Sequence, residues 1–261
     1  MKVVLFCGGL GMRLKEYSEI IPKPMINIGY RPILWYVMKY YAHFGHKDFI
    51  LCLGYKADVI KQYFLGYDEC LSNDFVLTGG GQKVDLLNSD IHDWRITFVD
   101  TGPTSPIGER LRLVREHLRG EEMFLANYSD CLTDLDLAAY LDVFKAQKVI
   151  AGMVTVPPNV SFHYVEADGG MVSSITDAHS TPLRVNGGFF VFRQEIFDYV
   201  NSGEELVEEP FERLIQRRQL LAYEYNGFWK AMDTFKDKHQ LDALLAVGTP
   251  PWEVWRRRPP E

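Results

Sequence analysis

A glycine-rich turn near the start of the chain has the residue types that bind phosphate. An apolar run ends at Cys7, and three glycines follow between Gly8 and Gly11. Glycines let backbone N–H groups approach an anion closely because they carry no Cβ atom. Arg13 comes two residues after the turn, and its planar guanidinium group suits phosphate oxygens. The turn is therefore expected to hold a phosphate.

A lysine between two prolines supplies a second cation close to this turn. Lys23 is flanked by Pro22 and Pro24, which restrict the backbone on both sides. A solvated lysine in an ordinary turn would explain Lys23 alone. It would not explain Lys23 together with the glycines and Arg13, so we interpret Lys23 as a positioned charge.

Two common phosphate-binding patterns do not fit this turn. The pattern GxxxxGK followed by Ser or Thr is absent. A dinucleotide-binding GxGxxG that started at Gly9 would need glycine where the chain has Leu14. An NAD-dependent oxidoreductase is therefore a weak alternative.

The elements that must position these residues alternate between strand and helix over residues 1–156. Strands are expected at residues 2–6, 48–54, 95–100, 121–130 and 149–156, and helices at 31–45, 56–66, 109–120 and 136–147. This alternation predicts an α/β fold, a three-layer αβα sandwich with a mostly parallel sheet. Ligands of such sheets bind beyond the carboxyl ends of the strands, where the glycine turn lies.

Residues 157–261 show a different pattern and are expected to form a smaller mixed α+β lobe of the same single domain. Strands are expected at 162–167, 172–176, 187–192 and 221–226, and helices at 210–218 and 237–247. Residues 73–93 interrupt the first pattern with three consecutive glycines. This segment predicts a long loop or a hairpin, and a role in forming a homo-oligomer is one hypothesis for it.

Composition excludes several classes of protein. The chain of 261 residues has a formal net charge of -7, which disfavours a nucleic-acid surface. No apolar stretch approaches the roughly 20 residues that a membrane helix needs, and the start of the chain does not have the pattern of a signal peptide. The four cysteines are scattered, which favours free thiols in the cytoplasm.

Several motifs together resemble one family. FCGGLGMRL, PKPM, DTGPTSPIGERL, YSDCLTDLDL, NGGFFVF and GFWKAMDTFKDK are similar, in order and approximate spacing, to motifs of the sugar-1-phosphate nucleotidylyltransferases, and within them of the glucose-1-phosphate cytidylyltransferases. The resemblance covers nearly the whole chain. It implies the Rossmann-like nucleotide-diphospho-sugar transferase fold, with a nucleotide-binding core at 1–156 and a sugar-phosphate-binding part at 157–261.

The resemblance also implies an activity and its residues. An NTP, CTP being favoured, and a sugar-1-phosphate, glucose-1-phosphate being favoured, would give an NDP-sugar and pyrophosphate. Mg²⁺ would be held by Asp130 and Asp233, and the catalytic residues would be Arg13, Lys23, Asp130 and Asp233. The nucleotide-binding residues would be Cys7, Gly8, Gly9, Leu10, Gly11, Met12, Arg13, Lys23, Ser105, Gly108, Arg110 and Ser129. The residues on the sugar-phosphate side would be Lys23, Asn186, Gly187, Gly188 and Trp229.

Structural roles are open for several of these residues. Asp130 and Asp233 could each cap a helix, and Arg110 could lie on a helix surface. The glycines at 187–188 could form a strand bulge, and Trp229 could belong to the core.

The chain also departs from the family pattern. Relatives carry a sugar-phosphate-binding lysine before the NGG segment, whereas this chain has no lysine between Lys148 and Lys230. His179 or Arg184 could replace it. The acceptor could therefore be another sugar phosphate, a cyclitol phosphate or a phosphonate. A protein that binds nucleotide without catalysis is a further alternative.

Overall fold

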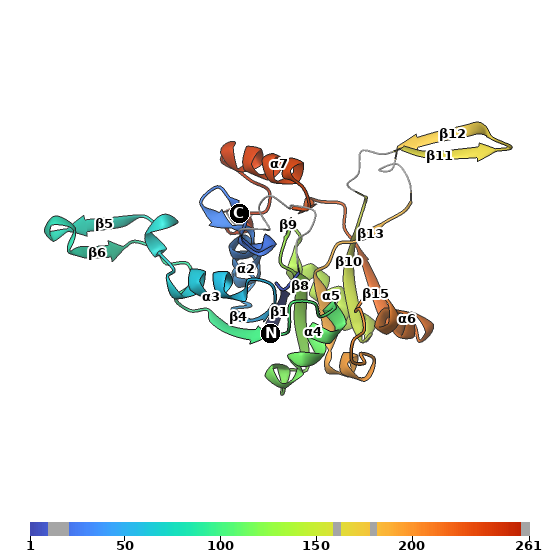
Figure 1. Cartoon of the computed structure of the whole chain (residues 1–261), viewed down its shortest axis with the longest axis horizontal. Coiled ribbons are helices and arrows are strands. Elements are labelled where there is room, and N and C mark those ends of the chain that lie inside the picture. The colour runs from blue at the N-terminus through green and yellow to red at the C-terminus, as the bar shows by residue number, and fades with distance from the viewer. Residues whose placement is uncertain (10–20, 159–162, 178–181, 257–261) are drawn as a thin grey trace.

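A computed structural model of the chain describes residues 1–9, 21–158, 163–177 and 182–256. A sheet of eight strands runs through the molecule (Figure 1). Across the sheet the strands follow the order β13 (Val185–Asn186), β10 (Ala151–Val156), β14 (Phe190–Arg193), β8 (Met123–Tyr128), β1 (Lys2–Phe6), β4 (Asp48–Leu53) and β7 (Arg95–Asp100). The eighth strand, β15 (Leu220–Glu224), pairs with β10.

The sheet is mostly parallel, as the alternation predicts. β7, β4, β1 and β8 run parallel to one another, and β15 runs parallel to β10. β14 lies antiparallel between β8 and β10, and β13 is antiparallel to β10. The boundary near residue 156 therefore does not divide the sheet, because β13, β14 and β15 come from the second part of the chain.

Both faces of the sheet are buried, which makes three layers. In β1, Val3 and Leu5 point into one apolar cluster and Val4 and Phe6 into the other. The first cluster receives side chains from α2 (Ile33–His43), α3 (Ala57–Leu65), α5 (Leu137–Gln147) and α7 (Phe235–Ala246). The second receives side chains from α4 (Ile107–Leu113) and α6 (Glu209–Gln216). Continuous apolar strands are required here because neither face is open to water.

Two expected elements differ from the structure. The helix expected over 109–120 is divided into α4 and a separate 3-10 turn, Arg115–Leu118. Residue spacing does not separate these forms, because side chains three apart share a face in both. The strand expected over 187–192 begins at Phe190, since Gly188 and Phe189 have positive φ angles of 75° and 49° and break the chain between β13 and β14.

Four smaller strand pairs surround the sheet. β2 (Asn27–Ile28) pairs with β3 (Arg31–Pro32), and β9 (Cys131–Thr133) pairs with β16 (Trp229–Ala231). Two hairpins, β5–β6 (Phe75–Thr78 and Lys83–Leu86) and β11–β12 (His163–Asp168 and Met171–Asp177), project from opposite ends of the molecule (Figure 1). The segment 73–93 thus contains a hairpin. Among the helices of the described residues, none has the length and apolar character that a membrane crossing requires.

Candidate active site

The Pro-Lys-Pro segment folds into a fixed turn. Lys23–Met25 form one turn of 3-10 helix, in which the Met25 N–H donates to the Pro22 carbonyl at 2.8 Å. Pro24 and Met25 are buried, so the turn is anchored to the core. The Lys23 ammonium group donates to Asp130 Oδ2 at 2.5 Å and to Asp233 Oδ1 at 2.6 Å. The Lys23 ammonium nitrogen therefore joins two aspartates that are distant from it in the sequence.

The pairing of two short strands brings the two carboxylates together. Asp130 lies beyond the carboxyl end of β8, directly before β9, and Asp233 follows β16. β9 and β16 are antiparallel, with Ala231 opposite Cys131, and the Met232 N–H donates to the Asp130 carbonyl at 2.9 Å. The register of this pair places both side chains at the same edge of the central sheet.

Neither aspartate caps a helix. Asp136 caps α5, since its side chain accepts from the Ala138 and Ala139 N–H groups. Thr234 caps α7, and Asp237 completes a reciprocal capping box with it. The structural alternative for Asp130 and Asp233 is therefore wrong, and their carboxylates face a cation instead.

Electrostatics keep Lys23 charged. Burial alone would lower the pKa of Lys23, but the negative charges of Asp130 and Asp233 outweigh it and raise the pKa above its ordinary value. The ammonium group marks a position at which two carboxylates favour positive charge. Both carboxylates supply the hard oxygen ligands that Mg²⁺ prefers. The described residues contain no group of three or more His, Cys, Asp or Glu side chains suited to a metal.

The described part of the glycine turn lies over a buried arginine. Arg110 donates to the Gly8 carbonyl at 3.1 Å, to the Leu53 carbonyl at 3.2 Å and to Thr101 Oγ1 at 2.8 Å. A Cβ atom on Gly8 would lie 1.9 Å from Arg110 Nη1. The close approach of the guanidinium group therefore favours glycine at position 8.

Arg110 is a positioning residue in this geometry. Its side chain is buried, so it does not lie on a helix surface, and it ties together the chain segments that follow β1, β4 and β7. Those segments lie at the carboxyl edge where a nucleotide is expected. A direct contact between Arg110 and the nucleotide stays a prediction.

Three other residues expected at the nucleotide site also bind neighbouring segments. Ser105 Oγ donates to the Thr101 carbonyl at 2.5 Å, and Ser129 Oγ donates to the Phe6 carbonyl at 2.8 Å. A Cβ atom on Gly108 would lie 2.5 Å from the Glu204 carbonyl, so close packing against that backbone requires glycine there. Their contacts with nucleotide stay predictions. Cys7 is buried and Gly9 is exposed at the turn, whereas Leu10, Gly11, Met12 and Arg13 lie outside the described residues.

Apart from Lys23, which binds the two aspartates, the residues expected on the sugar-phosphate side form one cluster. The Trp229 indole donates to the Gly187 carbonyl at 2.8 Å, and Asn186 donates to the Tyr128 hydroxyl at 3.2 Å. The Gly188 N–H donates to Asn186 Oδ1 at 2.9 Å. Tyr128 ends β8, two residues before Asp130, so this cluster adjoins the aspartate pair. The glycines also form the break between β13 and β14, as the structural alternative proposed.

Sequence reasoning missed some supporting residues. Asn127 is fully buried, and its Oδ1 accepts from the Phe189 N–H at 2.9 Å, which fixes the segment next to Gly188. Lys230 is buried and donates to Asp237 at 3.1 Å, which links β16 to α7. Lys230 lies inside the GFWKAMD motif, so the motif could have indicated it. No local sequence pattern indicated Asn127.

Arg184 does not present a free guanidinium group. It donates to the Thr155 carbonyl at 2.9 Å, to the Tyr225 carbonyl at 2.7 Å and to Asn226 Oδ1 at 3.0 Å. These bonds hold the ends of β10 and β15 together. His179 lies outside the described residues.

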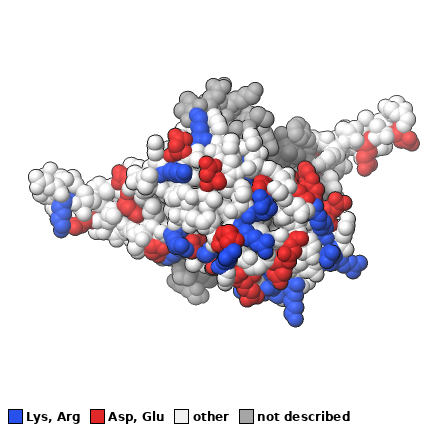
Figure 2. Space-filling model, turned by 60° about the horizontal axis from the view of Figure 1, so that its bottom comes forward, with Lys and Arg blue, Asp and Glu red and all other residues white. Residues whose placement is uncertain are grey.

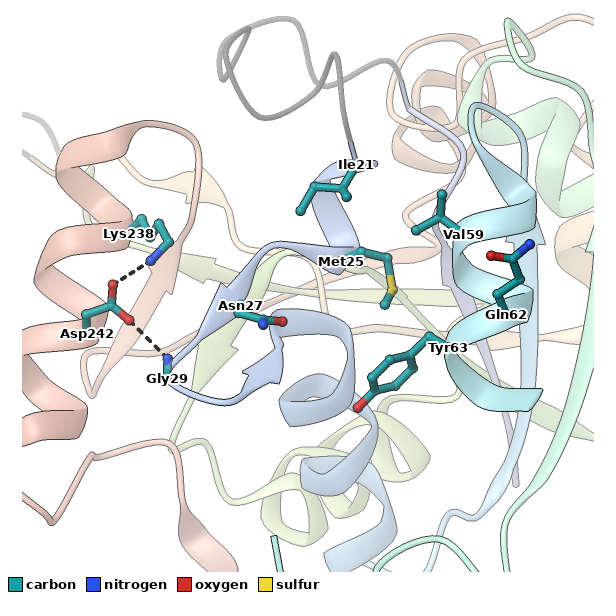
Figure 3. A pocket seen from close by; sticks show the side chains of 9 residues that line it. All are labelled: Ile21, Met25, Asn27, Gly29, Val59, Gln62, Tyr63, Lys238 and Asp242. Carbon is teal, nitrogen blue, oxygen red and sulfur yellow. Dashed lines mark hydrogen bonds and ion pairs between the residues drawn. The ribbon is translucent and has the colours of Figure 1, made fainter. Parts of the chain in front are cut away.

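A cavity of about 690 Å³ lies beside the Lys23 turn (Figure 3). Met25 and Asn27 form one side, Tyr63 from α3 another, and α7 a third. On α7, Asp242 accepts from Lys238 at 2.6 Å and from the Gly29 N–H at 3.1 Å. The cavity thus lies between the segments that follow Lys23 and Asp233.

Comparison with known proteins identifies the family. Residues 2–244 match the model of the nucleotidyl transferase family. The chain is 38% identical over 257 residues to glucose-1-phosphate cytidylyltransferase of Salmonella typhi, covering 98% of this chain and 100% of the relative. It is 23% identical over 256 residues to mannose-1-phosphate guanyltransferase of Saccharomyces cerevisiae, covering 91% of this chain and 62% of the relative.

Solved structures show the same fold. The crystal structure of UDP-glucose pyrophosphorylase with UDP-glucose gives a TM-score of 0.69 at 13% identity, covering 94% of this chain and 98% of that chain. The crystal structure of HddC from Yersinia pseudotuberculosis gives a TM-score of 0.62 at 18% identity, covering 94% of this chain and 99% of that chain. With the motif order and the full-length match, these findings show that the chain belongs to the nucleotidyl transferase family.

Proposed function

We propose that this protein is a sugar-1-phosphate nucleotidylyltransferase that releases pyrophosphate. The carrying observation is the Lys23 ammonium group held between Asp130 and Asp233 at the carboxyl edge of the sheet. A lysine and two carboxylates here suit a reaction that brings two polyanions together. The 38% identity to a glucose-1-phosphate cytidylyltransferase supports CTP and glucose-1-phosphate as the substrates.

The chain's own residues would act by binding and alignment. The acceptor phosphate already carries most of its second negative charge near neutral pH, since a phosphate monoester has a second pKa of ~6. No side chain has to remove a proton. Lys23, with Arg13, would stabilise charge on the α-phosphate and on the departing pyrophosphate. The cluster that contains Trp229 and Asn186 would hold the sugar ring beside Lys23.

We propose Mg²⁺ as the cofactor, held by Asp130 and Asp233. When bound there, the ion would supply positive charge that neutralises phosphate oxygens. The support is the pair of carboxylates that already share one positive charge. Lys23 would then turn toward the phosphates.

The acceptor is the least determined part of the proposal. The chain has no lysine between Lys148 and Lys230, and Arg184 is engaged with the ends of two strands. A different sugar phosphate, a cyclitol phosphate or a phosphonate is the alternative acceptor. We also propose a cytoplasmic location, supported by four unpaired cysteines, of which Cys7, Cys52 and Cys131 are buried.

The test is pyrophosphate release with Mg²⁺, using each of CTP, UTP, ATP, GTP and dTTP against a panel of sugar-1-phosphates. We expect release with CTP and glucose-1-phosphate, and its loss in Asp130→Ala. Release only with another acceptor would retain the chemistry and change the substrate. Nucleotide binding without release from any pair would favour a non-catalytic binding protein.

A further inference from the structure

A buried lysine comes three residues before Asp233, one of the two candidate metal ligands. Acidic and basic side chains are spread over the face of the molecule in Figure 2, whereas Lys230 is the one lysine of the described residues that is buried, at 7% exposure. It belongs to β16, where it lies opposite Leu132 of β9. A buried ammonium group costs free energy unless it is paired. The groups that Lys230 contacts therefore show what its charge holds in place.

The partner of Lys230 is Asp237, in the first turn of α7. Lys230 Nζ donates to Asp237 Oδ1 at 3.1 Å, and among the described residues this is its one ion pair. The Asp237 side chain is 20% exposed, so both charges are largely shielded from water. Such a pair adds little net stability compared with apolar side chains of similar volume, but it can fix one arrangement of the chain. The arrangement fixed here is that of the segment between the two residues.

The second oxygen of Asp237 holds the segment that carries Asp233. Asp237 Oδ2 accepts from the Asp233 N–H at 3.2 Å, from the Thr234 N–H at 2.9 Å and from Thr234 Oγ1 at 2.7 Å. Of these three bonds, the capping box of α7 needs the one from the Thr234 N–H. The bond from the Asp233 N–H lies outside the box and fixes the backbone of Asp233 itself. Lys230 thus binds one oxygen of a carboxylate whose other oxygen orients Asp233.

Asp233 depends on this support more than Asp130 does. Asp130 lies between β8 and β9, so a strand fixes the chain on each side of it. Asp233 follows the end of β16, and its side chain is 37% exposed, compared with 22% for Asp130. Groups that bind a ligand or a metal have to be held within about 0.5 Å of the productive geometry. The contacts of Asp237 supply this restraint on the Asp233 side of the pair.

We propose that Lys230 is a positioning residue, which holds Asp237 so that the Asp233 carboxylate stays beside Asp130 to bind a divalent cation. The inference rests on the proposed function, in which these two aspartates hold Mg²⁺. Loss of the ammonium group removes the donor of Asp237 Oδ1, and the carboxylate can then turn toward water. The bond from the Asp233 N–H is the longest of the three to Oδ2 and would be lost first. Residues that orient a metal ligand in this way change metal affinity by about 10–100-fold.

A positioning role and a purely electrostatic role predict opposite effects for Lys230. A positive charge that only lies near the site repels a divalent cation, so its removal would tighten cation binding. A positive charge that keeps Asp233 in place strengthens cation binding, so its removal would weaken it. The sign of the change in affinity therefore separates the two roles.

The experiment measures Mn²⁺ binding to the full-length protein by electron paramagnetic resonance, with and without CTP. Mn²⁺ takes the same kinds of oxygen ligand as Mg²⁺ and is detected without turnover. Lys230→Met keeps an unbranched side chain of similar length and removes its charge. Lys238→Met is the matched control, because Lys238 lies on α7 and pairs with Asp242 at 2.6 Å. Urea denaturation shows whether each variant is folded under the binding conditions.

We expect Lys230→Met to weaken Mn²⁺ binding about tenfold, and Lys238→Met to change it less than about twofold. At saturating Mg²⁺ the kcat for pyrophosphate release by Lys230→Met should recover most of the wild-type value, since the loss lies in metal affinity. The double variant Lys230→Met/Asp237→Asn leaves no unpaired buried charge, so it keeps the test valid if Lys230→Met alone does not fold. It should bind Mn²⁺ at least as weakly as Lys230→Met, because the two residues act in series.

Unchanged or tighter Mn²⁺ binding in Lys230→Met or in the double variant would overturn the proposal, and so would an equal loss in Lys238→Met. Mn²⁺ binding that is absent from the wild type, or that survives in both Asp130→Ala and Asp233→Ala, would overturn it together with the proposed metal site. Loss of binding in those two variants but not in Lys230→Met would leave the metal site intact and overturn only the role of Lys230. Binding that depends on Lys230, without pyrophosphate release from any substrate pair, would support the positioning role and contradict the proposed activity.

Discussion

Two clusters of charged residues in this chain look similar in composition but differ in their surroundings. In one, Lys23 meets Asp130 and Asp233; in the other, Asp90 is surrounded by Lys39 and Arg31. The Asp90 side chain is 7% exposed, whereas that of Asp233 is 37% exposed. Asp90 accepts hydrogen bonds from Lys39, and from the side chains of Tyr67, Ser72 and Asn73.

The difference separates a structural network from a site. A buried carboxylate surrounded by donors has little capacity left for a ligand, and its partners hold the fold in place. A cation between two partly exposed carboxylates can exchange its partners for phosphate. Both clusters pair lysine with aspartate, but one holds a cation between two carboxylates and the other a carboxylate among several donors.

Removing the cation of the site should give the largest effect. We expect Lys23→Met to lower the rate of pyrophosphate release about 10³-fold, because one preorganised charge at the reacting phosphate is lost. The free energy of unfolding should fall by less than in Asp90→Asn, since solvent screens part of the charge of Asp233, whose side chain is 37% exposed. Steady-state kinetics and urea denaturation measure the two quantities. Lys47→Met, at the exposed pair with Asp93, is the control; an equal loss of rate in both variants would contradict the assignment.

Breaking the network around Asp90 should have the opposite effect, lowering stability while leaving activity unchanged. Asp90→Asn leaves the buried Arg31 and the half-buried Lys39 without their carboxylate, which costs about 3 kcal/mol of folding free energy. Release of pyrophosphate per folded molecule should remain near that of the wild type. Thermal and urea unfolding check the stability, with Asp93→Asn as the exposed control. A folded, stable Asp90→Asn protein that has lost activity would mean that the network belongs to the site.

The Arg110 support of the glycine turn can be tested with neighbouring glycines. Gly8→Ala would bring a Cβ atom to 1.9 Å from Arg110 Nη1, whereas a Cβ atom on Gly9 would meet none of the described residues within 4 Å. Overpacking of this kind costs about 1–3 kcal/mol, so we expect Gly8→Ala to lower stability and to raise the KM for nucleotide. Gly9→Ala should change the stability by about 0.5 kcal/mol or less. Equal stabilities of Gly8→Ala and Gly9→Ala would show that the Arg110 side chain can move away from the added Cβ atom.

The pH dependence of stability should distinguish the Asp90 network from the Lys23 site. Burial would raise the pKa of Asp90, but its bonds to Lys39 and Ser72 hold it below the ordinary value. Its contribution is therefore present above the unfolded pKa of about 3.9 and is lost as the pH falls. Arg213 lowers the pKa of Glu204 to about 2, and Arg112 lowers that of Glu109 to about 2, which adds to this loss.

The Lys23 contribution lies at the other end of the pH range. Its pKa is raised by Asp130 and Asp233 against the effect of burial, so its contribution is present below the unfolded pKa of about 10.4 and is lost as the pH rises further. Urea denaturation over both the acidic and the alkaline range measures these contributions. Between pH 2 and 5, the free energy of unfolding of Asp90→Asn should change less steeply with pH than that of the wild type. Lys23→Met should flatten only the alkaline part of the profile. A flattened acidic part in Lys23→Met would contradict the division.

Much of the fold was predictable because its signals are local. Five strand-like runs predicted β1, β4, β7, β8 and β10, and all of these except the edge strand β7 are largely buried, where an apolar run is needed. The site was predictable only in part. The glycine turn and the Pro-Lys-Pro segment indicate phosphate chemistry, but Asp130 and Asp233 resemble ordinary helix caps until β9 pairs with β16.

The amino-acid sequence by itself determined the alternation of strands and helices, the glycine turn after β1 and the stiff segment around Lys23, because each depends on residues close together in the chain. Tertiary structure alone decided that Lys23 lies between Asp130 and Asp233, that Arg110 is buried beneath Gly8, and that the register of β5–β6 gathers its apolar residues on one face. Those arrangements depend on contacts between distant segments, which propensity and spacing do not specify.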